Sequence, residues 1–206
     1  MSAVFIKNFQ VGHLQANCYI VVNEETLQCV VIDPGDESNI ILDYIEENKL
    51  KTEAIFLTHG HYDHTMAAEA VSQETGAPIY INEKDLDKDG YDPTFAYEGK
   101  DTKHYKDGDI IFAAGLEFDI IETPGHSPGS VCIICQDVMF SGDTLFRGAC
   151  GRVDLPGGHM DELAQSLRKL YELEGDYEVM PGHEGTTTLE NERKFNDFMH
   201  YALGEI

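Results

Sequence analysis

The segment Thr58–His64, with the sequence THGHYDH, places three imidazoles and one carboxylate within six consecutive positions. It directly follows the apolar run Ala54–Leu57, whose branched and aromatic side chains predict a buried strand. Side chains two positions apart on an extended chain point to the same side, so His59 and His61 can bind one ion. The pair Asp63–His64 comes where the chain turns toward a helix, and it can face a second ion. Histidines also cluster by chance, but this spacing favours a metal site.

Four further polar residues each follow an apolar run, at a turn that contains glycine. His126 lies in TPGHSPG, Asp143 in FSGDTLF, Arg152 in ACGRVD and His183 in MPGHE. Such strand ends are where rigid scaffolds hold functional side chains. One histidine alone in such a position is more often a hydrogen-bonded core residue than a ligand. Beside the segment Thr58–His64, however, the balance reverses, and His126 and His183 are better interpreted as ligands.

The composition predicts an acidic globular protein with one domain over residues 1–206. The formal net charge is −24, from 14 Lys and Arg against 38 Asp and Glu, which argues against nucleic acid or anionic membranes as partners. No run approaches the roughly 18 apolar residues of a membrane helix. Five cysteines, and no basic and apolar signal before Val4, predict a cytoplasmic protein with reduced thiols. The sequence sets no oligomeric state.

Hydrophobic periodicity predicts two runs of strands, each followed by helices, and hence two sheets covered on their outer faces. The expected strands are 4–9, 18–22, 29–32, 54–57, 77–81, 110–113, 117–122, 131–135 and 178–180. Helices are expected after the turn 33–36, over 65–75, after a cap at Asp161 and from Thr187 onward. The first of these should carry Ile40, Ile41, Tyr44 and Ile45 on one face, and the last should bury Phe195, Phe198, Met199 and Ala202.

Two further patterns have structural interpretations that we prefer. Residues 83–109 are charged with scattered aromatics, and 85–90 match the start of a calcium-binding loop. The twelfth loop position is Ala96 instead of a bidentate Glu, which favours a surface loop or a lid over the site. Cys132 and Cys135 have a redox-like spacing, but residues three apart in a strand face opposite sides, so both are expected in the core.

The histidine segment with the later His126, Asp143 and His183 resembles the metallo-β-lactamase superfamily, over roughly Val11 to Arg193. Within it, GDTLF at 142–146, the pair Gly151–Arg152 and GHE at 182–184 are similar to glyoxalase II-like hydrolases. The resemblance implies an α/β fold, a four-layer αβ/βα sandwich of two mixed β-sheets flanked by helices, with metals at the sheet edges. Only 23 residues follow His183, so the chain resembles compact forms that lack the C-terminal helical domain.

The resemblance also implies which residues bind metal. One ion would be held by His59, His61 and His126, the other by Asp63, His64 and His183, with Asp143 bridging both. Imidazole and carboxylate ligands fit two zinc ions, and iron or manganese are compatible. Two such cations lower the pKa of a shared water from about 15.7 toward about 7, so a bridging hydroxide is the expected nucleophile. Asp63 or Asp143 could accept its proton as catalytic residues.

A thioester is the expected substrate, such as an S-hydroxyacyl thiol, because a thiolate leaves without a strong general acid. Arg152 matches a position that contacts the glutathione part of the substrate, although Asp154 replaces the family's aromatic residue and 65–67 replace its Gly-rich step. The alternatives are a mononuclear iron persulfide dioxygenase, with iron on His59, His126 and Asp143, and a lactonase of the same fold. A non-enzymatic binding protein would lack at least one ligand, and all seven are present.

Overall fold

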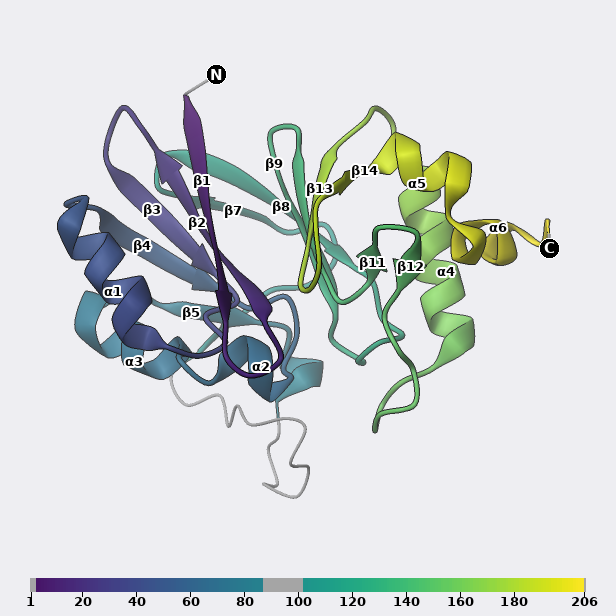
Figure 1. Cartoon of the computed structure of the whole chain (residues 1–206), viewed down its shortest axis with the longest axis horizontal. Helices are drawn as coiled ribbons and strands as arrows, with labels where there is room; N and C mark the ends of the chain where they lie inside the picture. Colours follow the sequence, from purple (N-terminus) through teal and green to yellow (C-terminus); the bar gives the residue numbers. More distant parts are fainter. Residues whose placement is uncertain (1–2, 87–101, 206) are drawn as a thin grey trace.

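Two six-stranded sheets pack face to face in the computed structural model, which describes residues 3–86 and 102–205 (Figure 1). The first sheet has the order β1-β2-β3-β4-β5-β6, antiparallel up to β3 and parallel from β3 to β6. Its strands are β1 (Val4–Val11), β2 (Ala16–Asn23), β3 (Gln28–Ile32), β4 (Lys51–Phe56), β5 (Ile79–Ile81) and β6 (Lys103–His104).

The second sheet has the order β14-β13-β10-β9-β8-β7, with β10 and β13 parallel and the other pairs antiparallel. Its strands are β7 (Ile110–Ala113), β8 (Leu116–Glu122), β9 (Val131–Cys135), β10 (Val138–Gly142), β13 (Glu178–Pro181) and β14 (Thr187–Thr188). A separate hairpin, β11 (Leu145–Phe146) and β12 (Ala149–Cys150), follows β10. Both sheets are therefore mixed, as the resemblance implied.

Helices cover the outer face of each sheet, and the core is divided accordingly (Figure 1). The helices are α1 (Ser38–Glu47), α2 (Tyr62–Thr65), α3 (Ala68–Thr75), α4 (Met160–Tyr171), α5 (Leu189–Phe195) and α6 (Asp197–Leu203), with the short 3-10 turn η1 (Glu83–Asp85). Ile41 of α1 and Val71 of α3 pack on the first sheet, and Leu163 of α4 and Met199 of α6 pack on the second. The four-layer αβ/βα sandwich is confirmed.

The layer between the sheets is aromatic. Phe56 of β4 packs edge-on against Phe118 of β8 with ring centroids 5.1 Å apart, and Tyr19 of β2 lies 5.3 Å from Phe140 of β10. Edge-to-face contacts of this kind add stabilisation beyond burial of area. The expectation for Cys132 and Cys135 is confirmed, because Cys132 faces the helical layer and Cys135 faces this central one.

The C-terminal helix differs from the prediction. The continuous helix expected from Thr187 is split at Asn196, whose backbone is extended and whose side chain caps α6. Thr188, not Thr187, caps α5 by accepting a hydrogen bond from the Asn191 backbone. The break changes the helical register, so Phe195 is 71% and Phe198 38% exposed instead of buried. Met199 and Ala202 are buried as expected.

Three smaller predictions are also corrected. Ile40 is exposed, because the buried face of α1 is formed by Ile41 and Ile45. The cap position before α4 is His159, and Asp161 lies in the first turn. The segment 65–75 is not one helix, since α2 ends at Thr65 and α3 begins at Ala68.

The lid and calcium-loop interpretations fall largely on residues 87–101, which lie outside the described residues. At its C-terminal end the segment 83–109 is part of the fold, since β6 pairs with β5 and Tyr105 is buried with its hydroxyl on the Leu57 carbonyl.

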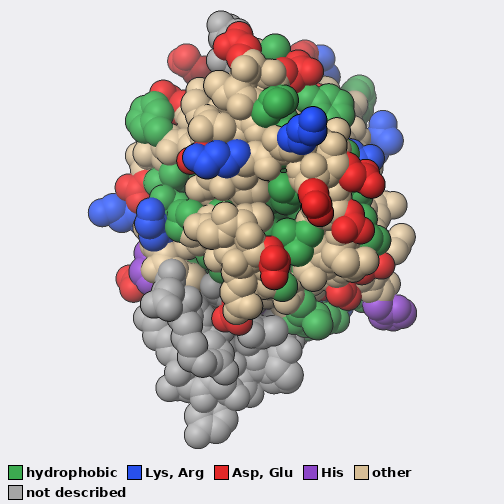
Figure 2. All heavy atoms as spheres, turned by 90° about the vertical axis from the view of Figure 1, so that its left-hand side faces the viewer, with side chains coloured by type: hydrophobic (Ala, Val, Ile, Leu, Met, Phe, Trp, Pro, Cys, Tyr) green, Lys and Arg blue, Asp and Glu red, His purple; other side chains and the backbone are tan. Residues whose placement is uncertain are grey.

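The acidic composition is visible on the face that includes α1 and α3, where Asp and Glu side chains are spread among apolar ones (Figure 2). Of the helices in residues 3–86 and 102–205, none has both the length and the apolarity needed to cross a bilayer.

Candidate metal centre

The predicted residues lie where strands of both sheets end. β3 and β4 are parallel with Ile32 opposite Phe56, so the segments that follow them leave the same edge. β10 and β13 are parallel with Gly142 opposite Pro181, which places Asp143 beside His183. Because parallel strands share a C-terminal edge, residues distant in sequence meet there.

Strand β2 holds the two sheets together at this edge. The Asn17 side chain donates to the Pro181 carbonyl at 2.9 Å, and the Tyr19 hydroxyl donates to the same oxygen at 2.7 Å. The Asn17 backbone N–H donates to the Gly182 carbonyl at 2.7 Å. These bonds fix the turn that carries His183 against the first sheet.

One group of possible ligands consists of His59, His61 and His126. Each offers a ring nitrogen, and the three nitrogens lie within 4.8 Å of one another. All three side chains are buried, and His61 Nδ1 is 2.9 Å from His126 Nε2. The structure thus brings together the three histidines assigned to one ion from the sequence.

A second group consists of Asp63, His64 and His183, whose donor atoms also lie within 4.8 Å of one another. His183 Nε2 is 3.2 Å from Asp63 Oδ2 and 3.3 Å from His64 Nε2. Asp63 and His64 belong to the short helix α2, which turns them toward the strand end that presents His183. This is the second set predicted from the sequence.

Asp143 lies between the two groups. Its Oδ1 is 3.5 Å from His64 Nε2, and its Oδ2 is 3.5 Å from His126 Nε2 and 3.6 Å from His183 Nε2. One carboxylate therefore lies beside members of both groups. Its Oδ1 faces His64, and its Oδ2 faces His126 and His183. A bridging ligand requires this arrangement.

Asp33, which follows β3, also belongs to the site, although the sequence predicts only a turn at 33–36. It is buried, and its carboxylate accepts hydrogen bonds from the Thr58 N–H at 2.7 Å, the Thr58 hydroxyl at 2.6 Å and His64 Nδ1 at 3.0 Å. Because the Thr58 proton goes to Asp33, the Thr58 oxygen accepts from His59 Nδ1 at 3.1 Å. A carboxylate behind a ligating histidine fixes its ring and its tautomer.

The hydrogen bonds among the described residues leave two polar atoms of this centre unsatisfied. His59 Nε2 and Asp143 Oδ1 are buried and have no hydrogen-bond partner in the described part of the chain. An unsatisfied buried polar atom costs about 1–3 kcal/mol. A divalent cation coordinated by imidazole and carboxylate would satisfy these atoms, so the residues fit a metal.

The electrostatics of the two groups differ. Burial, together with the nearby histidines, lowers the pKa of His59 and lowers that of His61 to about 4, so both are neutral at pH 7. Burial also opposes the charged form of His64, but Asp143 and Asp33 outweigh it and raise its pKa to about 9. His183 and His64 lower the pKa of Asp63 to about 2 against the opposing effect of burial. His59 and His61 therefore offer neutral ring nitrogens, whereas His64 must release a proton before it can bind a cation.

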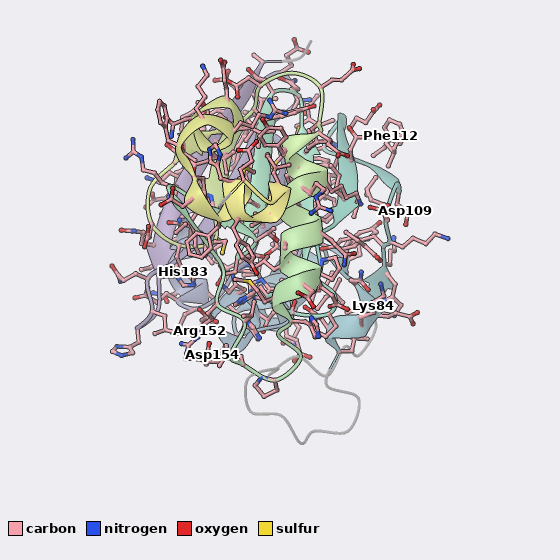
Figure 3. All side chains as sticks on the ribbon, turned by 90° about the vertical axis from the view of Figure 1, so that its right-hand side faces the viewer. Lys84, Asp109, Phe112, Arg152, Asp154 and His183 are labelled. Atoms are coloured by element: carbon pink, nitrogen blue, oxygen red, sulfur yellow. The ribbon has the colours of Figure 1, made fainter. Side chains whose placement is uncertain are left out.

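Arg152, the predicted substrate contact, lies on the loop before α4 beside Asp154 (Figure 3). Its backbone carbonyl accepts from His126 Nδ1 at 2.8 Å, which orients that histidine. Its guanidinium is exposed and forms two hydrogen bonds with the Asp154 carboxylate, at 2.6 and 2.7 Å, and this lowers the pKa of Asp154 to about 2. The basic charge expected for substrate binding is thus paired within the loop.

The remaining histidines lie outside both groups: His13, His104, His159 and His200.

The fold and this constellation define the class of the protein. The sequence matches the Metallo-beta-lactamase superfamily over residues 11–183, and the chain belongs to that superfamily. It is a metal-dependent hydrolase by class.

Similar proteins cover nearly the whole chain. An uncharacterized protein of Mycobacterium leprae is 36% identical over 95% of this chain and 99% of its own length. The probable metallo-hydrolase YqgX of Bacillus subtilis is 35% identical, over 94% of this chain and 97% of its own. The hydroxyacylglutathione hydrolase GloC of Haemophilus influenzae is 34% identical, over 95% and 98%.

Solved structures of similar proteins have the same fold. TTHA1623 in a di-iron-bound form superposes with a TM-score of 0.83 at 34% identity, covering 94% of this chain and all of that one. BLEG-1, a B3 metallo-beta-lactamase, gives a TM-score of 0.84 at 30% identity, covering 95% and 99%. ETHE1 from Myxococcus xanthus gives 0.82 at 25% identity, covering 97% and 90%.

Proposed function

We propose that this protein is a dinuclear metal hydrolase of a thioester, with zinc as the working metal and a small S-acyl thiol as substrate. The observation that carries the proposal is the position of Asp143, within 3.5–3.6 Å of His64, His126 and His183. A site for one ion would not need a carboxylate shared by two ligand groups. The name of the 34% identical hydroxyacylglutathione hydrolase supports the substrate class.

In this proposal, His59, His61 and His126 hold one ion and Asp63, His64 and His183 the other. When bound, the ions would lower the pKa of a shared water and polarise the scissile carbonyl. Zinc fits the nitrogen and oxygen donors, and iron and manganese fit them too, as the di-iron form of a relative illustrates.

The chain's own groups orient the reaction. Asp33 and the Arg152 carbonyl hold His64 and His126 in the tautomers that turn Nε2 toward the centre. Asp63, with a pKa of about 2, stays ionised at neutral pH. Asp143 is the better placed proton acceptor, since its oxygens face both groups. A thiolate leaves without protonation, so no further acid is required.

The second candidate is the mononuclear iron persulfide dioxygenase, with iron on His59, His126 and Asp143. It is favoured by residues 151–154, whose Gly-Arg-x-Asp sequence resembles that of the persulfide dioxygenases and forms the Arg152–Asp154 pair next to His126. A lactonase differs from the thioesterase only in the leaving group.

One experiment separates the three. The metal-loaded protein is assayed with a panel of thioesters, the matching lactones and glutathione persulfide, with and without a chelator. Chelator-sensitive thioester cleavage with little lactone cleavage supports the proposal. Oxygen uptake with the persulfide, and no hydrolysis, would replace it with the dioxygenase.

A further inference from the structure

Asp85 is a buried carboxylate outside the seven predicted ligands. It ends the turn η1 after β5, and only 1% of the residue is exposed. Burial raises its pKa, as expected for an anion taken out of water. A buried carboxylate persists only where hydrogen bonds compensate for its lost hydration.

The compensation comes from two loops. Asp85 Oδ2 accepts from the Gly60 N–H at 2.9 Å and from the Ser127 hydroxyl at 2.6 Å. Its Oδ1 accepts from the Gly129 N–H. Since the Ser127 proton goes to Asp85, the Ser127 oxygen accepts from Ser130, 2.6 Å away, which extends the network.

The backbone of Gly129 packs closely against the Asp85 carboxylate. A Cβ at this position would lie 2.6 Å from Asp85 Oδ1, below the distance that real Cβ atoms tolerate. Glycine therefore lets the backbone N–H reach the carboxylate. The same donors fill most of the acceptor positions of Asp85, which argues against its use as a calcium-loop ligand.

The donors are adjacent to ligands of one group only. Gly60 lies between His59 and His61, and Ser127 directly follows His126. Asp33 behaves differently, since it accepts from His64 of the other group and also reaches His59 through Thr58. Asp85 is thus the carboxylate whose donors adjoin the three-histidine group alone.

We propose that Asp85 is a positioning residue that holds the His59–His61 loop and the His126 loop at the spacing one ion needs. The proposal rests on the metal-binding part of the proposed function and not on the thioester substrate. Loss of an outer-shell partner of this kind typically weakens metal binding about 10–100-fold. The weakening should be confined to the three-histidine half.

The test measures zinc affinity by competition with a chromophoric chelator, in two backgrounds. His183→Ala leaves the three-histidine group complete, and His126→Ala leaves the Asp63–His64–His183 group complete. Asp85→Asn is then added to each, because it keeps the side chain's shape while directing an amide N–H at a backbone N–H. The two backgrounds form a double-mutant comparison that isolates the coupling.

Asp85→Asn should weaken zinc binding about 10–100-fold in the His183→Ala background and leave it unchanged in the His126→Ala background. The matched control is Asp107→Asn, because Asp107 also joins two segments, through Lys169 and the Glu122 N–H, but away from the ligands. It should change neither affinity.

Equal weakening in both backgrounds, or none in either, overturns the positioning role. If Asp85→Asn does not fold, as judged by circular dichroism, Ser127→Ala replaces it and should show a smaller effect in the same background. A wild-type protein that binds two zinc ions but cleaves no thioester would refute the proposed substrate and leave this inference standing.

Discussion

Gly182 provides a sharp test of the site geometry, because it packs directly against two predicted ligands. A Cβ added there would lie 2.2 Å from Asp143 Oδ1 and 2.7 Å from His64 Cε1, where ordinary contact begins at 3.4 Å. The backbone cannot move away easily. The Gly182 N–H donates to the Gly142 carbonyl at 2.8 Å, and the Gly182 carbonyl accepts from the Asn17 N–H at 2.7 Å.

Gly182→Ala should therefore displace the Asp143 carboxylate by about 1 Å, and a misplacement of this size costs about 100-fold in rate. Overpacking a filled interior also destabilises a protein by about 1–3 kcal/mol, which most domains survive. The assay is metal-dependent thioester hydrolysis, together with metal content and thermal unfolding.

The matched control is Gly185→Ala in the same turn, where an added Cβ meets nothing within 4 Å. It should retain hydrolysis and metal content. Equal activity and equal metal content in the two folded variants would refute the close packing of Gly182 against the ligands.

Three further predictions concern other parts of the chain. Asp143→Ala should abolish turnover and release at least one metal, since it contacts both groups; near-normal hydrolysis contradicts the bridging role. Glu192 is buried, and although burial raises its pKa, hydrogen bonds from Thr187 and the Gly148 N–H lower it further than burial raises it. Its stabilisation is then present above the unfolded pKa of about 4.3 and lost as pH falls through the lower folded value. Urea unfolding from pH 7 to 3 should show a flatter pH dependence for Glu192→Gln than for the wild type, whereas parallel curves refute the assignment. Asp154→Asn frees the Arg152 guanidinium, so KM should fall for a thioester with an anionic thiol part and not for a neutral one. An unchanged KM ratio would count against Arg152 as a substrate contact.

The strands, and the residues that lie at the strand ends, could be predicted from the sequence because both follow local pattern. Apolar runs followed by Gly-bearing turns mark strand ends, and histidine spacing on an extended chain sets which side chains share a face. The pairing of His126 with His61, and of His183 with Asp63, came from the resemblance, because it depends on how two sheets meet.

The carboxylates that support the ligands, Asp33 and Asp85, are harder to predict from the sequence. Asp33 follows an apolar strand just as Asp143 does, and that position was an available signal for it. No sequence signal marks Asp85 as a supporting residue, because it lies in a charged segment and its partners, Gly60 and Ser127, are distant in sequence. Phe195 was misplaced for a local reason: Asn196 ends one helix and caps the next, so the apolar periodicity spans a break.

If the Asp143 carboxylate joins two metal positions, the chain should bind two ions, and metal stoichiometry measures this. The metal-free protein is titrated with zinc, and bound metal per chain is measured by elemental analysis after removal of the excess. We expect two zinc ions per chain. Saturation at a single metal ion per chain, with Asp143 intact, would contradict it.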